Sequence, residues 1–244
     1  MDSEAKVGYF TGNPYCYIDF GSSKEKRARL VTGSISLKLG EGKETTVTEV
    51  IAENGAAFLS DGLTLISECC SYQPGEGKFV FWSREPSHVG LIAASDGSLV
   101  AFHRLEFFPK SDQLIIKEPY FLGAFQGKTF SAKAAVCYIE LSSQYTPKTA
   151  TLAGKVSVHA IEPNQISALC ADRVECDMAT KHIDVRAAPG KKALYCDTKN
   201  HLLAKANLFT ISFVQGNPVV RGLDDVRFEF IKGKKMANIL AEME

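Results

Sequence analysis

Apolar and polar residues alternate with a period of two along most of this chain. The pattern is clearest at residues 34–39, 155–160 and 182–187, where every second residue is apolar. A strand with this pattern can bury one face and leave the other in water, as strands do in antiparallel sheets. Turn-forming pairs such as Asn54-Gly55 separate the alternating segments at intervals of about 8 to 12 residues, which favours a sandwich or a small barrel.

Helical periodicity is confined to the end of the chain. Met236, Ile239, Leu240 and Met243 recur there at the spacing i, i+3, i+4, i+7, which places them on one helix face. The sequence therefore predicts an all-β fold of antiparallel strands, followed by a short C-terminal helix over residues 234–243.

Composition narrows the class of protein further. The chain has 244 residues, 45% of them hydrophobic, and 28 Lys and Arg balance 28 Asp and Glu. These values are ordinary for a globular protein and exclude a disordered or fibrous chain. The zero net charge lacks the basic bias that is typical of non-specific nucleic-acid binding. No run approaches the roughly 18 apolar residues of a membrane helix, so no transmembrane segment is expected.

The cysteines indicate a compartment. There are seven, without any C-x-x-C motif, and residues 1–6 lack the basic-then-apolar pattern of a secretory signal. Disulfides persist in oxidising compartments, so this odd, unpatterned set reads as reduced thiols. We therefore expect an intracellular, cytoplasmic protein.

The chain resembles itself at an offset of about 121 residues. At that offset residues 16–20 (CYIDF) match 137–141 (CYIEL), and residues 31–37 match 152–158 without a gap. Three more blocks match at nearby offsets: 63–65 with 183–185, 78–82 with 191–195, and 104–108 with 227–231. Colinear matches with shifts confined to turns predict an internal duplication, with β-domains at residues 1–123 and 124–244. No flexible linker separates the copies, so we expect them to pack on each other.

Two short basic clusters stand out against the balanced charge. The first comprises Lys24, Lys26, Arg27 and Arg29, and its counterpart in the second copy holds one Lys; the second comprises Lys232, Lys234 and Lys235. Cations at a helix start oppose the helix dipole, so local folding does not explain the second cluster. Both clusters suit a solvated loop, an acidic partner or a nucleic-acid backbone.

Two histidines and three aromatic residues are further candidates for contact sites. The alignment places His88 and His201 at matched positions, each after a polar turn and before an apolar strand. They suit either a hydrogen bond that fixes the turn or a pair of equivalent contact sites. Tyr120, Phe121 and Phe125 lie where the two copies join, where we expect them to fill the interface between domains or to form an exposed partner site.

Catalytic, metal and cofactor motifs are not evident in the sequence. The repeated Gly-Glu-Gly-Lys string at 40–43 and 75–78 lacks the spacing of a phosphate loop and suits a hairpin turn. His182 and Asp184, with Cys176 nearby, are too few for a zinc site of recognisable spacing. We expect no catalytic residue, no metal and no cofactor.

The leading functional hypothesis is a non-catalytic protein-binding or scaffold protein whose two similar β-domains present paired interaction surfaces. The alternative is a self-assembling structural protein of the viral matrix or coat type. An enzyme with a site between the copies is a third hypothesis. We expect a protein partner or self-association, with nucleic acid bound only through the basic clusters.

Overall fold

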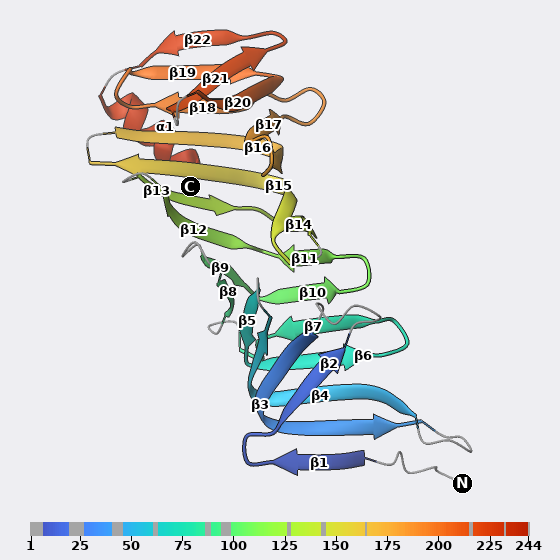
Figure 1. Ribbon diagram of the computed structural model, residues 1–244. Coiled ribbons are helices and arrows are strands. Elements are labelled where there is room, and N and C mark those ends of the chain that lie inside the picture. The colour runs from blue at the N-terminus through green and yellow to red at the C-terminus, as the bar shows by residue number, and fades with distance from the viewer. Residues whose placement is uncertain are drawn as a thin grey trace. The chain divides into compact units, whose positions relative to one another are not determined.

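The structure of the protein is a computed structural model (Figure 1). It describes residues 7–19, 27–40, 46–60, 63–85, 89–93, 99–125, 128–142, 145–163, 165–214, 217–231 and 233–243. Within this part of the chain it contains 22 strands and one helix, and the strand pairs of known register are antiparallel. The predicted all-β class is confirmed. The chain divides into two compact units, unit 1 with residues 1–117 and 140–146, and unit 2 with residues 118–139 and 147–244.

Unit 1 is organised around one long hairpin. Its strands are β1 (Val7–Thr11), β2 (Tyr15–Asp19), β3 (Arg27–Leu39), β4 (Val47–Leu59), β5 (Thr64–Ser67), β6 (Cys69–Gln73), β7 (Lys78–Trp82), β8 (Gly90–Ala93), β9 (Leu99–Phe102), β10 (Arg104–Phe108) and β11 (Gln113–Lys117). Strands β3 and β4 form the hairpin, with β1 and β2 paired to the other edge of β3. The sheet forks at β4 into the branches β5–β8–β9 and β6–β7–β10–β11.

Unit 2 is organised in the same way. Its elements are β12 (Tyr120–Phe125), β13 (Lys128–Lys133), β14 (Val136–Leu141, whose last two residues belong to unit 1), β15 (Pro147–Glu162), β16 (Gln165–Asp177), β17 (His182–Arg186), β18 (Ala193–Asp197), β19 (Leu202–Ala206), β20 (Leu208–Val214), β21 (Asn217–Leu223), β22 (Arg227–Phe230) and α1 (Lys234–Met243). Strands β15 and β16 form the long hairpin, and β13 pairs with the other edge of β15. At β16 the sheet forks into the branches β17–β20–β21 and β18–β19–β22.

The two units thus share one order of strand pairing, in which β3 corresponds to β15, β4 to β16 and β10 to β22. Some registers agree as well. Leu105 lies opposite Phe81 in unit 1. At an offset of 123 residues, Phe228 lies opposite Ala204 in unit 2. This agreement supports the internal duplication, which stays a prediction together with the boundary at residues 123 and 124. One block of the sequence alignment does not fit this order. It matches residues 78–82, which form β7, with residues 191–195, which lead into β18. The order of strand pairing matches β7 with β19 instead.

A glycine interrupts each long hairpin at a corresponding place. The register of β3 and β4 shifts at Gly33, and that of β15 and β16 shifts at Gly154. A Cβ atom on Gly33 would lie 2.8 Å from the carbonyl oxygen of Asn54. Gly154 has a φ of +77°, and a Cβ atom there would lie 2.9 Å from the Cβ of Ala135. Both bulges therefore require a residue without a side chain.

The core of unit 1 is aromatic. The rings of Phe58, Phe79 and Phe107 are fully buried, and the centroid of Phe58 lies 5.4 Å from that of Phe107 in an edge-to-face contact. Tyr145 packs edge-to-face on Phe107 with a centroid distance of 5.5 Å. Residues 140–146 thus complete the core of unit 1 although they follow the first strands of unit 2 in the chain.

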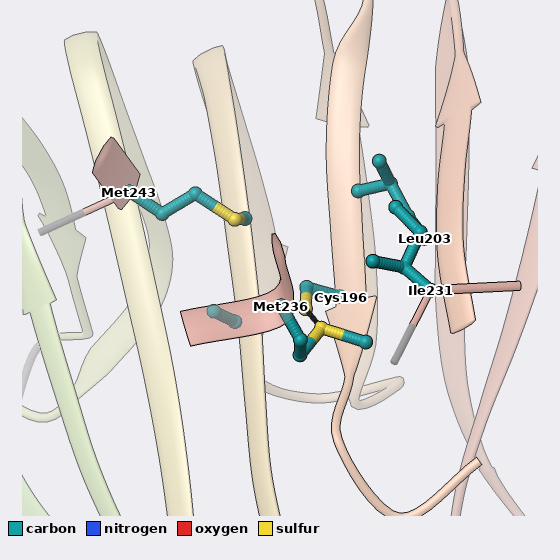
Figure 2. Packing of buried hydrophobic residues seen from close by; sticks show 6 residues of the cluster. Cys196, Leu203, Ile231, Met236 and Met243 are labelled. Atoms are coloured by element: carbon teal, nitrogen blue, oxygen red, sulfur yellow. Dashed lines mark hydrogen bonds between the residues drawn. The ribbon is translucent and has the colours of Figure 1, made fainter. Parts of the chain in front are cut away.

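Sulfur-containing side chains close the core of unit 2 (Figure 2). Met236 and Met243 project from α1 and are buried in a cluster with Ala168, Cys196, Leu203 and Ile231. The sulfur atoms of Cys196 and Met236 are 3.0 Å apart. The predicted helix is confirmed, and its apolar stripe is the face that packs on the sheet.

The bulges generate a prediction about stability. Replacing Gly33 or Gly154 by Ala should lower the free energy of unfolding by about 1–3 kcal/mol, because the new Cβ atom forces either a backbone contact or a strained φ. Urea unfolding followed by circular dichroism measures the change. Gly75→Ala is the matched control, since no heavy atom lies within 4 Å of its Cβ position. Equal stability of all three variants would contradict the requirement for glycine at the bulges.

Candidate functional site

Two tyrosines and an arginine form an exposed surface on the β2–β3 hairpin of unit 1. The side chains of Tyr15 and Tyr17 are 57% and 71% exposed, and their ring centroids are 5.8 Å apart in an edge-to-face contact. The guanidinium carbon of Arg29 lies 4.6 Å from the centroid of the Tyr15 ring, within cation–π distance. We call Tyr15, Tyr17 and Arg29 the tyrosine–arginine surface.

The alternation of the two strands creates this surface. Cys16 lies opposite Leu30, which is fully buried, and Tyr17 lies opposite Arg29, which is exposed. Successive side chains of a strand point to opposite faces, so the apolar pair faces the core and the Tyr–Arg pair faces water. Large aromatic rings held in place by a stacked guanidinium group offer contact area with little conformational entropy left to lose on binding.

The first basic cluster is placed in part. Arg29 lies in the tyrosine–arginine surface, and Arg27 begins β3, although its side chain is outside the described residues. Lys24 and Lys26 also lie outside the described residues. In the sequence these cations precede the strand that carries Arg29. The aromatic half of the surface was missed in the sequence, because alternating tyrosines are as typical of a core face as of an exposed one.

The second basic cluster lies at the start of α1. Lys234 and Lys235 are exposed in the first turn of the helix, and Lys232 is outside the described residues. No acidic residue occupies that turn. The two described lysines stand beside the N-terminal end of the helix dipole, which is the unfavourable end for a cation. Their contribution to binding stays a prediction.

The predicted match of His88 with His201 does not fit the strand order. His201 lies in the turn between β18 and β19, whereas the chain places His88 between β7 and β8 and outside the described residues. His201 has a φ of +54°, and its carbonyl oxygen accepts a hydrogen bond of 2.7 Å from the Ile231 amide. The turn itself is held by Asp197, whose carboxylate accepts hydrogen bonds from the amides of Lys199 and Asn200. An Asp at the start of a polar turn is the sequence signal for this role.

The aromatic residues near the middle of the chain lie on β12 of unit 2. Tyr120 is exposed, with the amino group of Lys133 5.8 Å from its ring centroid, and Phe121 is half-buried. The side chain of Phe125 is outside the described residues. Their role between the domains stays a prediction.

Burial is the main influence on the cysteines, including Cys69, whose pKa it raises although the neighbouring Arg84 acts in the opposite direction. All seven cysteines are unpaired, and Cys69, Cys70, Cys137 and Cys196 are buried. Burial raises the pKa of Cys137 to about 12 and the pKa of Cys176 to about 11. A nucleophilic cysteine needs a lowered pKa, so these two thiols are protonated and inert at neutral pH.

The histidine, carboxylate and cysteine near β17 do not converge. His182 Nε2 lies 3.0 Å from Asp184 Oδ1, and Arg186 also contacts that carboxylate. Cys176 lies opposite Ile183, on the other face of the strand from His182. Among the described residues, no group of three His, Cys, Asp or Glu side chains is close enough to hold a metal ion.

A shallow hollow of about 340 Å³ lies in unit 1 between β3, β4 and the β6–β7 turn. Its lining includes Lys38, Glu49 and Glu76. Lys38 pairs with Glu49 at 2.6 Å, and Glu76 pairs with Lys78 at 2.8 Å. These charges satisfy one another, so the hollow offers weaker recognition chemistry than the tyrosine–arginine surface.

Comparison with protein-family models and with curated proteins finds no match for this sequence. Within the described residues, no helix combines the length and the apolar character that crossing a membrane requires. The function proposed below is therefore inferred from the geometry of the described surfaces.

Burial of Cys137 generates a prediction about pH. Its raised pKa means that the folded state holds the thiol proton more tightly than the unfolded state does. This stabilisation is complete below the unfolded pKa and is lost as the pH rises towards the folded pKa. Between about pH 8 and pH 10.5 the free energy of unfolding of the wild type should fall by about 2 kcal/mol more than that of Cys137→Ala.

Urea unfolding of both proteins across this pH range measures the difference in slope. Ile139→Val is the control, because it truncates a buried side chain of the same strand without removing a titrating group. It should lower stability by about 1 kcal/mol at every pH. Parallel pH profiles for the wild type and Cys137→Ala would contradict a raised pKa at this site.

Proposed function

We propose that the protein is a binding protein, and that the tyrosine–arginine surface of unit 1 engages an acidic segment of a protein partner. The observation that carries the proposal is the arrangement of Tyr15, Tyr17 and Arg29, two largely exposed rings with a guanidinium group stacked on one of them. Tyrosine and arginine are the residues most enriched at the energetic centres of protein interfaces.

Charge favours an acidic partner. Lys24, Lys26 and Arg27 lie within five residues of Arg29 in the sequence, so this segment of the chain is rich in positive charge. A guanidinium group stacked on a ring keeps N–H groups that can donate to a carboxylate in a bidentate manner. The corresponding strand of unit 2 carries the exposed Tyr138, but residues 144–149 hold one cation. The proposed site therefore belongs to unit 1.

A protein partner fits better than a nucleic acid. Affinity for a nucleic acid grows with the number of phosphates that a protein neutralises, and this chain has no net charge. Single-stranded nucleic acids also need a basic groove that follows their backbone. Two exposed tyrosines beside a short basic segment suit instead a short peptide that carries both carboxylates and apolar side chains.

Fluorescence anisotropy tests this proposal. The probes are a labelled peptide of alternating glutamate and leucine residues and a labelled oligothymidylate of equal charge. The full chain should bind the peptide more tightly than the oligonucleotide, and the affinity should fall as salt screens the charges. Arg29→Ala and Tyr17→Ala should each weaken peptide binding at least about fivefold.

Tyr138→Ala is the matched control, because it removes an exposed tyrosine from the corresponding strand of unit 2. It should bind the peptide like the wild type. Absence of peptide binding, equal affinity for the oligonucleotide, or an Arg29→Ala variant of unchanged affinity would each contradict the proposal.

A further inference from the structure

Strand β22 is the counterpart of β10, yet its surroundings differ. Strand β10 (Arg-Leu-Glu-Phe-Phe) pairs with β7 on one edge and with β11 on the other. Strand β22 (Arg-Phe-Glu-Phe) pairs with β19 on one edge, and its other edge has no partner among the described residues (Figure 1). The chain enters α1 at the point where unit 1 continues into β11.

The apolar side chains of β22 are also exposed. Leu105 and Phe107 of β10 are fully buried, whereas the matched Phe228 and Phe230 of β22 are 62% and 80% exposed. Two adjacent phenylalanines of one strand face with this exposure form an apolar patch beside an open sheet edge. Such an edge is a template for pairing with another strand.

The backbone of β22 presents free hydrogen-bonding groups in the same place. The Ile231 amide donates to the carbonyl oxygen of His201 on the β19 side at 2.7 Å. Hydrogen-bonded pairs alternate along an antiparallel ladder, so Glu229 and Arg227 also direct their backbone groups towards β19. The N–H and C=O groups of Phe228 and Phe230 therefore point to the open edge.

The sequence of β22 is complementary to itself. If two copies of the strand pair antiparallel with Phe228 opposite Phe228, Arg227 of each copy lies opposite Glu229 of the other. These Arg–Glu pairs occupy the positions between hydrogen bonds, where the strands' α-carbons are closest, at about 4.5 Å. Shifting the register so that Phe228 lies opposite Phe230 would instead place Glu229 opposite Glu229. Charge thus selects one register.

We propose that β22 is a dimerisation edge at which a second copy of this chain adds its own β22 in antiparallel pairing about a two-fold axis through Phe228. The two Phe228 residues exchange N–H···O=C hydrogen bonds, and Phe230 of each copy pairs with Val226 of the other. Both Arg227–Glu229 pairs form at once, because a two-fold interface repeats every contact. The strand is short and the interface therefore small, so the dimer is weak and forms at high protein concentration. This surface is separate from the tyrosine–arginine surface, and neither proposal depends on the other.

Sedimentation equilibrium of the full chain over a range of concentrations tests the proposal. The variants compared are ones in which the charges of residues 227 and 229 are reversed. Arg227→Glu and Glu229→Arg each replace two attractive contacts by two repulsive ones and should weaken dimerisation at least about tenfold. The double variant R227E/E229R restores opposite charges and should return the Kd to within about threefold of the wild type. Arg227 and Glu229 are exposed and make surface ion pairs with Asp225 and Lys205, so these variants should keep the fold.

Arg104→Glu is the matched control, because it makes the same change on β10, whose edge β11 already occupies. It should dimerise like the wild type. A wild-type chain that stays monomeric at every concentration overturns the proposal, whatever else binds to β22. A dimer that Arg227→Glu leaves intact, or that the double variant fails to restore, overturns it too. Far-ultraviolet circular dichroism of each variant separates lost pairing from lost folding.

Discussion

Each unit depends on the antiparallel pairing of two long strands, β3 with β4 and β15 with β16. In unit 1, β1, β2, β5 and β6 pair with that hairpin directly, and β7 and β8 pair with β6 and β5 in turn. The hairpin can serve two branches because its strands are longer than any partner, so that β4 pairs with β6 near Ala52 and with β5 near Phe58. Each hairpin carries a bulge: Asn54 and Gly55 of β4 lie opposite Gly33, and Gly154 and Lys155 of β15 lie opposite Asp172. A bulge bends its strand and increases the local twist.

Different elements follow the last strand of the corresponding branches in unit 1 and unit 2. The branch that ends in β10 is continued by β11, whose Leu114 and Ile116 are buried. The branch that ends in β22 is followed by α1, whose methionines cover Cys196 and Leu203. A strand that follows forms hydrogen bonds with the N–H and C=O groups at the edge of the preceding strand. A helix covers a face of the sheet but leaves that edge open. The difference in the element that follows thus explains why the outer edge of β10 is paired and that of β22 is open.

Local sequence patterns predicted the strands and the helix well, but they did not predict which strands pair with each other. Alternation at residues 34–39 and 155–160 identified strand segments, and the spacing of Met236 and Met243 identified α1, because both signals depend on near neighbours in the chain. The fork at β4 depends on which strand pairs with each half of β4. The two halves do not differ in a pattern of apolar and polar residues that would predict this. The same limit applies to the site. The basic run around Arg29 was visible, whereas the exposure of Tyr15 and Tyr17 required the pairing of Cys16 with Leu30. The match of His88 with His201 depended on aligning β7 with β18, whereas the order of strand pairing aligns β7 with β19.

The position of Tyr145 affects the order in which the molecule can be completed during synthesis. The strand pairs of known register join residues within about 30 positions of each other, so each hairpin can form soon after its second strand leaves the ribosome. Tyr145 is different, because its ring packs on Phe107 of unit 1 although the intervening residues 118–139 belong to unit 2. The nascent unit 1 therefore exposes one side of its phenylalanine cluster until residue 145 has left the ribosome, and the first strands of unit 2 are synthesised before unit 1 is complete.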